Sequence, residues 1–497
     1  MTAVPAAPRG GWDLVVVGGG TAGLVGARTA AGFGARVLLV ERSRTGGDCL
    51  WTGCVPSKAL IAAAAAASSA RRATGLGIRT GPAEVDFSAV LAQVRAATAA
   101  IEPADSPDTL RRHRVQVVIG AARFDGPAAL MVDDRPVPFR RVLLATGAEP
   151  ALPAVPGLAD GIPLTTDSVW QLAQLPGRLL VLGGGSVGCE LGQAFARLGS
   201  VVTLVEAGPR LLPREDPDAA ALIQAALAAD GVRVQVGAAV QQVHWDGDAG
   251  AGSATVAGVP VPFDRLLVAT GRSARTGGFG LGRAGIGLDP AGQVVVDRRL
   301  RTTNPAVWAA GDVTGHPRFT HVAAVHAALA ASNAVLGLRR CVDLTAVPRV
   351  TFTDPEVAAV GPVAPAGAAE AAGAAGAAEA AGRAGGWRVR TQPHDQVDRA
   401  ITDRRTDGFT RLHVDRRGRL RAATVVGPRA GESLAELSLA VRHGLKASDL
   451  AGIHAYPTYS DGVWLAGVAE LQAGLATPLT RRVLRLLLRL RRVRAPA

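Results

Sequence analysis

The amino-acid sequence predicts an α/β protein built around two copies of one strand–turn–helix–strand unit. The first copy, DLVVVGGGTAGLVGARTAAGFGARVLLVE, covers residues 13–41, and the second, RLLVLGGGSVGCELGQAFARLGSVVTLVE, covers residues 178–206. In each copy an apolar run is followed by three glycines, a helical stretch and a second apolar run that ends in glutamate. A length of 497 residues, 48% of them hydrophobic, leaves room for further domains with cores of their own.

The first copy has the pattern of a dinucleotide-binding turn. Gly18, Gly20 and Gly23 fit G-x-G-x-x-G directly after the predicted strand Leu14–Val17. The first two glycines allow a tight turn and a close approach to a pyrophosphate, and the third allows the helix to pack against the sheet. The helix N-terminus offers free N–H groups to phosphate. Glu41 closes the next strand, where a carboxylate can accept hydrogen bonds from ribose hydroxyls.

The second copy repeats this pattern with Gly183, Gly185, Gly188 and Glu206. Each of these residues lies 165 positions after its counterpart in the first copy. One glycine triplet is weak evidence, because ordinary turns use the same residues. Two complete copies, with strand, helix and acid in register, predict two Rossmann-like domains that bind two dinucleotides.

The acid of the second copy bears on the choice of nicotinamide. A carboxylate at Glu206 would repel the extra phosphate of NADPH, whereas an arginine would attract it. The sequence therefore favours NADH. Arg210 follows closely enough to keep NADPH as the alternative.

Cys49 and Cys54 raise the question of a structural pair, a metal site or a redox centre. Five residues of regular helix cover about 7.5 Å, more than the Cα separation of a disulfide. Gly53 could supply a distortion or a late helix start, and such a start would lower a thiol pKa. A zinc site needs more ligands, and the remaining cysteines, Cys189 and Cys341, stand alone.

Composition excludes several other classes of protein. Four cysteines in so long a chain favour a reducing, cytoplasmic environment. The sequence shows no signal peptide and no run of 18 uncharged apolar residues, so no membrane span is expected. The net charge of +13 is concentrated at the C-terminus, where seven arginines lie between Arg481 and Arg494 and no acid follows Glu470. Aromatic residues do not alternate with basic ones, so nucleic acid is not an expected partner.

At this point the chain resembles the flavoprotein disulfide reductases, the family of dihydrolipoamide dehydrogenase, glutathione reductase and mercuric reductase. The resemblance covers about residues 11–475. Its motifs are GGDCLWTGCVPSK (46–58), LATG (144–147), VATGR (268–272), TTNPAVWAAGD ending at Asp312, and VPRVTFTDPEVAAVG (347–361). It implies FAD and NAD(P)H as cofactors and a homodimer formed through a C-terminal α+β domain.

The resemblance also implies roles for single residues. Hydride from NAD(P)H reaches FAD, and the reduced flavin opens a Cys49–Cys54 disulfide. Cys54 faces the flavin as a thiolate, and Cys49 attacks the substrate. Lys58 and Glu190 form an ion pair beside the flavin ring. The further residues matched to cofactor-binding positions are Gly120, Thr146, Gly147, Gly271, Arg272 and Asp312.

The C-terminal segment HAYPTYSDG departs from the family pattern. Family members that act on dithiols carry a histidine where this chain has Tyr456, and a glutamate where it has Asp461. A tyrosine with a pKa near 10 is a poor base at neutral pH. His454 could replace the histidine, although residues two apart on an extended segment lie about 6–7 Å from each other.

This departure weakens lipoamide and glutathione as substrates. The sequence also argues against mercuric ion as the substrate, because mercuric reductases carry a C-terminal cysteine pair and no cysteine follows Cys341. The motifs GGDC and FTHVA (319–323) place the chain near the mercuric-reductase-like subgroup. A small acceptor is therefore expected: a quinone, another small oxidant, a disulfide or a metal ion. The alternatives are a dihydrolipoyl dehydrogenase that uses His454 and a non-turnover redox sensor or membrane-associated flavoprotein. No resident metal is predicted.

The family order sets the expected domains. They are an FAD-binding domain (1–155 and 276–345), an NAD(P)-binding domain (156–275), a dimerisation domain (346–475) with a low-complexity insertion (364–386), and a tail (476–497). Arginines in the tail recur every three or four residues, opposite leucines, which predicts a basic amphipathic helix. The tail suits contact through residues 481–494 with an anionic membrane surface at the inner face. Packing on the protein is the alternative.

Overall fold

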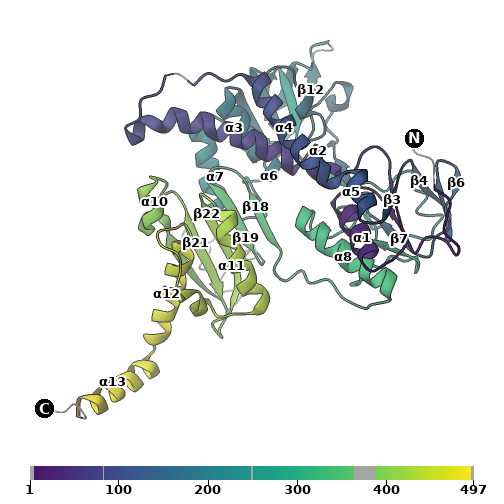
Figure 1. Cartoon of the computed structure of the whole chain (residues 1–497). Helices are drawn as coiled ribbons and strands as arrows, with labels where there is room; N and C mark the ends of the chain where they lie inside the picture. Colours follow the sequence, from purple (N-terminus) through teal and green to yellow (C-terminus); the bar gives the residue numbers. More distant parts are fainter. Residues whose placement is uncertain (1–4, 82, 248–249, 363–386, 494–497) are drawn as a thin grey trace. The chain divides into compact units, whose positions relative to one another are not determined.

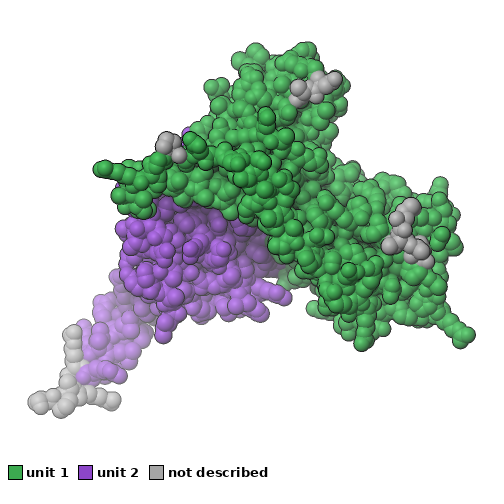
Figure 2. All heavy atoms as spheres, turned by 45° about the horizontal axis from the view of Figure 1, so that its top comes forward, with its two compact units in different colours: residues 1–207, 230–343 green, residues 208–229, 344–497 purple. Residues whose placement is uncertain are grey.

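The computed structural model describes residues 5–81, 83–247, 250–362 and 387–493. It divides into two compact units, coloured separately in Figure 2. Unit 1 comprises Met1–Ala207 and Asp230–Asp343, and unit 2 comprises Gly208–Ala229 and Leu344–Ala497.

A five-stranded parallel sheet organises the first part of unit 1 (Figure 1). Its order is β17 (Val307–Ala309), β7 (Val142–Leu144), β1 (Leu14–Val17), β2 (Val37–Glu41) and β3 (Val115–Ile119). Both faces are buried, as continuous apolar strands require. Leu14 and Val16 pack with helices α1 (Thr21–Gly32) and α8 (Thr320–Leu336). Val15 and Val17 pack on the opposite face with the small sheet β4–β5–β6 (Ala122–Gly126, Ala129–Val132, Arg135–Pro136).

A second parallel sheet repeats this plan. Its order is β11 (Arg233–Val236), β10 (Val201–Glu206), β9 (Arg178–Leu182) and β15 (Arg265–Val268). Helix α6 (Ser186–Leu198) follows its glycine turn. The antiparallel sheet β12–β13–β14 (Val240–Trp245, Gly252–Val256, Val259–Phe263) packs with β9 and β15. A ribbon of β8 (Ala148–Pro150) and β16 (Arg272–Ala274) runs antiparallel.

The remaining helices of unit 1 surround the cysteine motif. They are α2 (Gly47–Trp51), α3 (Cys54–Arg72), α4 (Phe87–Asp105) and α5 (Pro107–Arg112), with 3₁₀ turns at Ala73–Leu76, Leu158–Asp160 and Val169–Gln171. Residues 47–76 form one stretch that is long and apolar enough to cross a membrane by length and composition alone. Buried core helices meet the same criterion. Because α3 packs against α4 and α6 and lines the cavity described below, we assign it to the fold of unit 1.

Unit 2 is an α+β unit with one antiparallel sheet (Figure 1). The order is β18 (Pro348–Thr351), β19 (Glu356–Val360), β22 (Leu420–Gly427), β21 (Phe409–Val414) and β20 (Arg388–Pro393). Its helices are α7 (Pro217–Ala229), α10 (Asp398–Thr402), α11 (Ala430–His443), α12 (Asp461–Leu475) and α13 (Pro478–Val493), with 3₁₀ turns at His394–Gln396 and Ala447–Ala451.

The predicted fold class is confirmed, with two Rossmann-like sheets and a C-terminal α+β unit. The predicted domain boundaries stay predictions, and the structure adds one difference. It groups α7, which lies inside the predicted NAD(P)-binding domain, with unit 2. The buried guanidinium of Arg411 on β21 holds this segment through ion pairs with Asp216 (2.7 Å) and Asp218 (2.8 Å). The predicted insertion 364–386 lies outside the described residues.

Candidate active site

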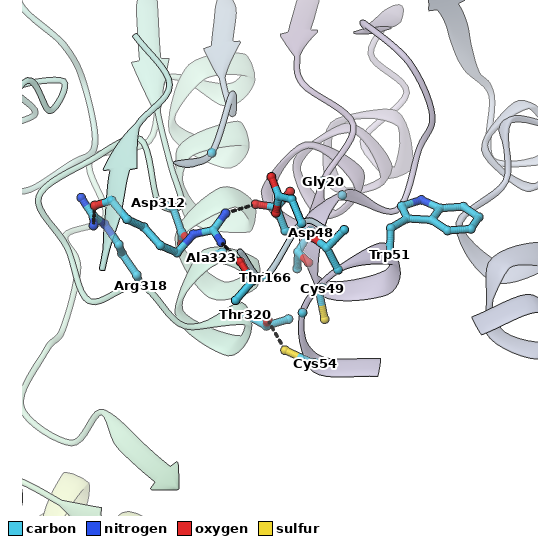
Figure 3. A pocket seen from close by; sticks show the side chains of 18 of the residues that line it. Gly20, Asp48, Cys49, Trp51, Cys54, Thr166, Asp312, Arg318, Thr320 and Ala323 are labelled. Carbon is cyan, nitrogen blue, oxygen red and sulfur yellow. Dashed lines mark hydrogen bonds and ion pairs between the residues drawn. The ribbon is translucent and has the colours of Figure 1, made fainter. Parts of the chain in front are cut away.

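A cavity of about 560 Å³ in unit 1 brings together most of the predicted site residues (Figure 3). This volume lies in the range of small-molecule sites. The predicted residues that line it are Gly18, Gly20, Glu41, Cys49, Cys54, Lys58, Thr146, Gly147, Glu190, Gly271, Arg272 and Asp312. They come from segments more than 290 residues apart in the chain, which the two parallel sheets bring to one place.

The first glycine turn has the geometry of a phosphate cradle. Gly18 adopts φ +104°, and a Cβ on Gly23 would lie 1.8 Å from the Gly18 carbonyl oxygen, so neither position accepts a side chain. Helix α1 begins after Gly20 with no side chain capping its N–H groups, which leaves them available to a pyrophosphate. Glu41 accepts the Gly19 N–H at 2.7 Å. The residues of this turn therefore fit the pyrophosphate and ribose of a dinucleotide.

The second glycine turn has nearly the same geometry. Gly183 adopts φ +106°, and a Cβ on Gly188 would lie 1.9 Å from the Gly183 carbonyl oxygen. Helix α6 begins after Gly185, again with no side-chain cap. Glu206 accepts the Gly184 N–H at 2.7 Å. These four predicted residues, like Gly23 and Gly120, do not line the cavity.

The two cysteines lie on either side of a break between two helices. Helix α2 ends at Trp51 and α3 begins at Cys54, so the two residues are not on one regular helix. Cys49 and Cys54 are free thiols that both line the cavity. The sulfur of Cys54 also lies 3.5 Å from the hydroxyl of Thr320, and Figure 3 shows the two side chains pointing toward one another. The late helix start that the sequence suggested is present at Cys54.

The two thiols differ in proton affinity. The hydrogen bond from Cys49, with further help from Thr320 and the charge of Lys58, lowers the pKa of Cys54 to about 6. The same hydrogen bond, together with burial, raises the pKa of Cys49. The pair therefore holds one thiolate, on Cys54, and one proton, on Cys49, at neutral pH. Such asymmetry is typical of reactive dithiols, in which the thiolate is the nucleophile and metal ligand.

Lys58 and Glu190 form the predicted ion pair. Their Nζ and Oε2 atoms lie 2.8 Å apart, joining α3 to α6. The Glu190 side chain is 7% exposed, whereas Lys58 is 37% exposed. The carboxylate thus orients a lysine whose charge also acts on Cys54, one turn earlier on the same helix.

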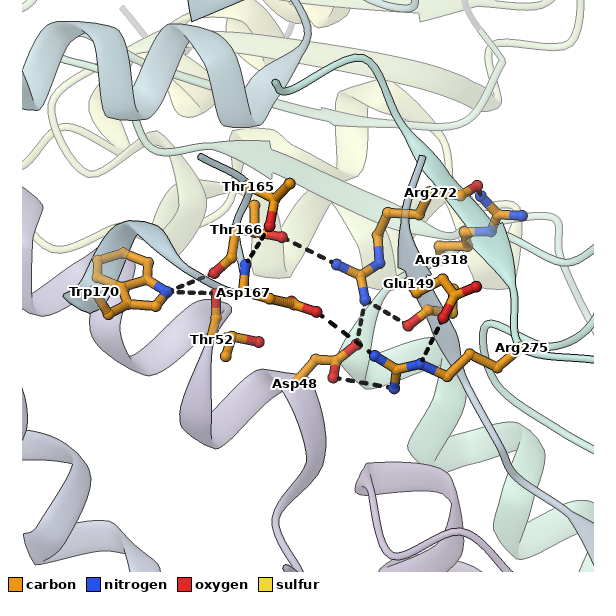
Figure 4. Close-up of polar contacts among 11 residues, drawn as sticks. Asp48, Thr52, Glu149, Thr165, Thr166, Asp167, Trp170, Arg272, Arg275 and Arg318 are labelled. Atoms are coloured by element: carbon orange, nitrogen blue, oxygen red, sulfur yellow. Dashed lines mark hydrogen bonds and ion pairs between the residues drawn. The ribbon is translucent and has the colours of Figure 1, made fainter. Parts of the chain in front are cut away.

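A network of polar contacts that the sequence did not reveal fixes the cysteine loop (Figure 4). The Asp48 carboxylate pairs with the guanidinium of Arg272 and lies 3.5 Å from that of Arg275. The indole N–H of Trp170 donates to the carbonyl of Thr52 at 3.0 Å, inside the cysteine motif. Two other segments of unit 1 thus fix the residues on either side of Cys49: one contacts Asp48, and the other contacts Thr52.

The sequence gives only weak evidence that these contact residues belong to the site. Asp48 and Thr320 lie in the motifs GGDC and FTHVA, which marked only a subgroup. Arg275 and Trp170 belong to no motif in the sequence, and the residues of the cysteine motif that they contact are more than 100 positions away. Arg318 also lines the cavity and donates to the Arg272 carbonyl. Burial raises the pKa of Asp312, although the charges of Arg272 and Arg318 oppose this shift.

The predicted acid–base residues lie in unit 2, in a segment with different contacts. The Tyr456 hydroxyl donates to Asp398 at 2.6 Å, and this hydrogen bond raises the pKa of Tyr456. His454 has acceptors near both ring nitrogens, the Glu436 carboxylate at 2.9 Å and the Gly452 carbonyl at 3.1 Å. Burial lowers the pKa of His454, but these contacts outweigh it and raise the pKa. Asp461 is buried and accepts the Thr458 N–H at 3.1 Å.

Comparison with known proteins decides the family. The model of the pyridine nucleotide-disulphide oxidoreductases matches residues 12–327, and the model of their dimerisation domain matches residues 347–466. The chain belongs to the pyridine nucleotide-disulphide oxidoreductase family. It is therefore an FAD-dependent oxidoreductase that uses NAD(P)H, and its dimerisation domain supports a homodimer.

Relatives within the family carry different names. The chain is 39% identical over 469 residues to the mercuric reductase of Streptomyces lividans, covering 92% of this chain and 95% of the relative. It is 35% identical over 480 residues to the dihydrolipoyl dehydrogenase of Thermus scotoductus, covering 92% and 97%. A solved Cu(II) complex of the HOCl-induced flavoprotein disulfide reductase RclA from Escherichia coli is 28% identical, with a TM-score of 0.78 over 90% of this chain and 98% of that one. These comparisons give no support to a membrane location.

Proposed function

We propose that this oxidoreductase delivers electrons from NAD(P)H, through the Cys49–Cys54 pair, to a thiophilic metal ion. FAD, held at the Gly18 turn, supplies the chemistry that links a hydride donor to a dithiol. The chain's own residues bind the metal, hold the proton of Cys49 and set the charge around the sulfurs.

The observation that carries this proposal is the presence of two sulfurs, those of Cys49 and Cys54, in the lining of the cavity. Thiolate sulfur is the ligand that soft metals prefer, and a pKa lowered to about 6 favours the thiolate of Cys54 at neutral pH. A metal that bound both sulfurs would displace the proton from Cys49, since metal ligands must be deprotonated. Among the described residues no group of three or more His, Cys, Asp or Glu could hold a resident metal ion. A metal at the two sulfurs is thus interpreted as substrate.

Disulfide and metal acceptors differ in whether they need a proton at the site. Reduction of a disulfide produces thiols, which need an acid–base group, whereas reduction of a metal ion needs none at the acceptor. Tyr456, at the family's histidine position, has a raised pKa and donates its hydroxyl proton to Asp398. The site is therefore better suited to a metal ion than to a dithiol or disulfide.

The names of two relatives support this proposal, whereas the dihydrolipoyl dehydrogenase supports the disulfide candidate below. One is a mercuric reductase, and a solved structure of another is a Cu(II) complex. The reaction balances for either metal. NAD(P)H gives two electrons and releases one proton, and the electrons reduce one Hg(II) to Hg(0) or two Cu(II) to Cu(I).

The test follows metal-dependent NAD(P)H oxidation at 340 nm by the FAD-loaded enzyme, without oxygen. Substitutions Cys49→Ser and Cys54→Ser should each lower the rate with Cu(II) and Hg(II) by about 10³-fold or more, as loss of a nucleophilic group does. Cys341→Ser is the matched control, because Cys341 is an exposed thiol outside the cavity. Unchanged metal-dependent turnover in both Cys49→Ser and Cys54→Ser would show that the pair does not carry electrons to the metal.

A disulfide acceptor is the second candidate, carried by the His454–Glu436 pair. An imidazole hydrogen-bonded to a carboxylate is the arrangement of an acid–base dyad. If it serves the reaction, His454→Gln should abolish lipoamide turnover and leave metal turnover unchanged.

A further inference from the structure

The C-terminal helix α13 has an apolar face that nothing in the described part of unit 2 covers. Pro478 begins the helix, and the Thr477 hydroxyl accepts the Thr480 N–H at 3.4 Å, so the sequence starts the helix at a defined position. In Figure 1, α13 extends from the end of α12 away from the sheet of unit 2. The matched dimerisation model ends at residue 466, before this helix.

The helix places most of its arginines on one face and most of its apolar residues on the other, with two exceptions: Leu488 lies on the arginine side, and Arg491 lies between Leu484 and Leu487. At 100° per residue, Arg481, Arg485 and Arg489 lie within about 80° of each other. The opposite face carries Leu479, Val483, Leu486, Leu487 and Leu490. These apolar side chains are between 48% and 74% exposed. A contiguous apolar face of this kind on an otherwise folded protein marks an interaction surface.

The charges of the tail select the partner. Seven arginines lie between Arg481 and Arg494, and no acid follows Glu470 in the sequence. If two copies of α13 paired through their leucines, the arginines would point outward from the pair and would meet no acid on the partner helix. An anionic surface with an apolar layer beneath it satisfies both faces, because leucines enter the acyl boundary while arginines stay at the phosphates.

The length of α13 fixes its orientation on such a surface. Sixteen residues make a helix about 24 Å long, and a spanning helix needs about 20 mostly apolar residues. Arginines at every third or fourth position exclude a span and leave the helix in the plane of the interface. A homodimer would present two such helices, and simultaneous contact raises the apparent affinity without a new contact.

We propose that α13 is an in-plane anchor that binds this oxidoreductase to bilayers with anionic headgroups. Arg481, Arg485 and Arg489 supply the electrostatic attraction, and Leu486, Leu487 and Leu490 supply the insertion. This anchor is independent of the acceptor at the cysteine pair, since vesicle binding is read without turnover.

The experiment is co-sedimentation of the full-length FAD-loaded protein with two kinds of vesicle, phosphatidylcholine alone and phosphatidylcholine with 30% phosphatidylglycerol. We expect binding to the anionic vesicles only, weakened by added salt. The triple variant Arg481→Glu, Arg485→Glu, Arg489→Glu should bind at least about 100-fold more weakly, since each basic residue near an anionic surface contributes about a factor of five and each introduced glutamate adds repulsion. Leu486→Ser, Leu487→Ser and Leu490→Ser together should also abolish sedimentation.

The matched control is Arg79→Glu, Arg298→Glu, Arg416→Glu, which makes the same change in net charge at exposed positions of other segments. It should bind vesicles nearly as the unmodified protein does. Equal loss in this control would mean that net charge, and not the helix, drives binding. Binding to neither kind of vesicle would overturn the proposal. A larger oligomer, detected by light scattering and absent from the leucine variant, would overturn it in favour of a protein partner. NAD(P)H oxidation by each variant serves as the check of folding.

Discussion

The cavity of unit 1 and the segment 454–461 of unit 2 differ in how far each keeps the family pattern. In the cavity, the structure brings together Cys49, Cys54, Asp312 and the Lys58–Glu190 ion pair, all of which match family motifs in the sequence. In the segment, Tyr456 stands at the histidine position and donates its hydroxyl to Asp398. The residues predicted to receive electrons thus match the family motifs, while the residue predicted to exchange protons with a dithiol differs. This difference supports the proposal that the acceptor is not a dithiol or disulfide.

Removal of the lysine charge should impair the cavity of unit 1 strongly, though less than loss of either cysteine. Lys58→Met should slow NAD(P)H oxidation with any acceptor by about 10²-fold, the usual cost of losing one electrostatic stabiliser. Lys58→Arg keeps the charge and should recover part of the rate. Stopped-flow measurement of the anaerobic reaction separates these variants. Equal rates for Lys58→Met and the unmodified enzyme would show that the ion pair serves structure alone.

The protonation of Cys54 can be followed without turnover. Because its pKa is lowered to about 6, the thiolate is present above that pH and is lost as the pH falls through it. The rate of alkylation of the reduced protein by iodoacetamide should fall about tenfold per unit below pH 6 and level off above pH 7. Peptide mapping assigns the label to Cys54. A midpoint near 9, the value of an ordinary thiol, would refute the asymmetry of the pair.

Restoring the family histidine at position 456 tests whether the segment 454–461 determines the acceptor. Tyr456→His should increase lipoamide-dependent NAD(P)H oxidation by about tenfold or more, since a placed acid–base group contributes 10²–10⁴-fold when fully oriented. Tyr456 is 72% exposed, so the substitution should leave the fold intact. Tyr456→Phe is the control, because it removes the contact with Asp398 without supplying a base. No gain in the histidine variant would mean that the segment does not set acceptor choice.

The smallest expected effect concerns the nicotinamide. The carboxylate of Glu206 ends β10 beside the second glycine turn, so NADH should be preferred several-fold over NADPH. Glu206→Gln keeps an oxygen that can accept the Gly184 N–H and removes the negative charge. It should narrow the preference, measured as the ratio of the two kcat/KM values. An unmodified enzyme that prefers NADPH would contradict the role given to this carboxylate.

Much of the fold and part of the site could be predicted because the signals are local. A glycine triplet between a strand and a helix is enough to predict the geometry of the turn. The near-identical φ values of Gly18 and Gly183 follow from that pattern. The start of α3 at Cys54 also follows from neighbouring residues. The Asp48–Arg272 and Trp170–Thr52 contacts could not be predicted, since each joins residues more than 100 positions apart. The grouping of α7 with unit 2 depends on the equally distant Arg411.

The measurement that tests the central claim most directly compares acceptors on the unmodified FAD-loaded enzyme. With NADH and without oxygen, kcat/KM is determined in parallel for Cu(II), Hg(II), lipoamide and a soluble quinone, and Cys49→Ser supplies the blank. We expect kcat/KM for the metal ions to exceed that for lipoamide by at least tenfold, and we expect the metal-dependent activity to be absent from Cys49→Ser. A kcat/KM for lipoamide or the quinone that exceeds the values for both metal ions would contradict the proposal of a metal acceptor.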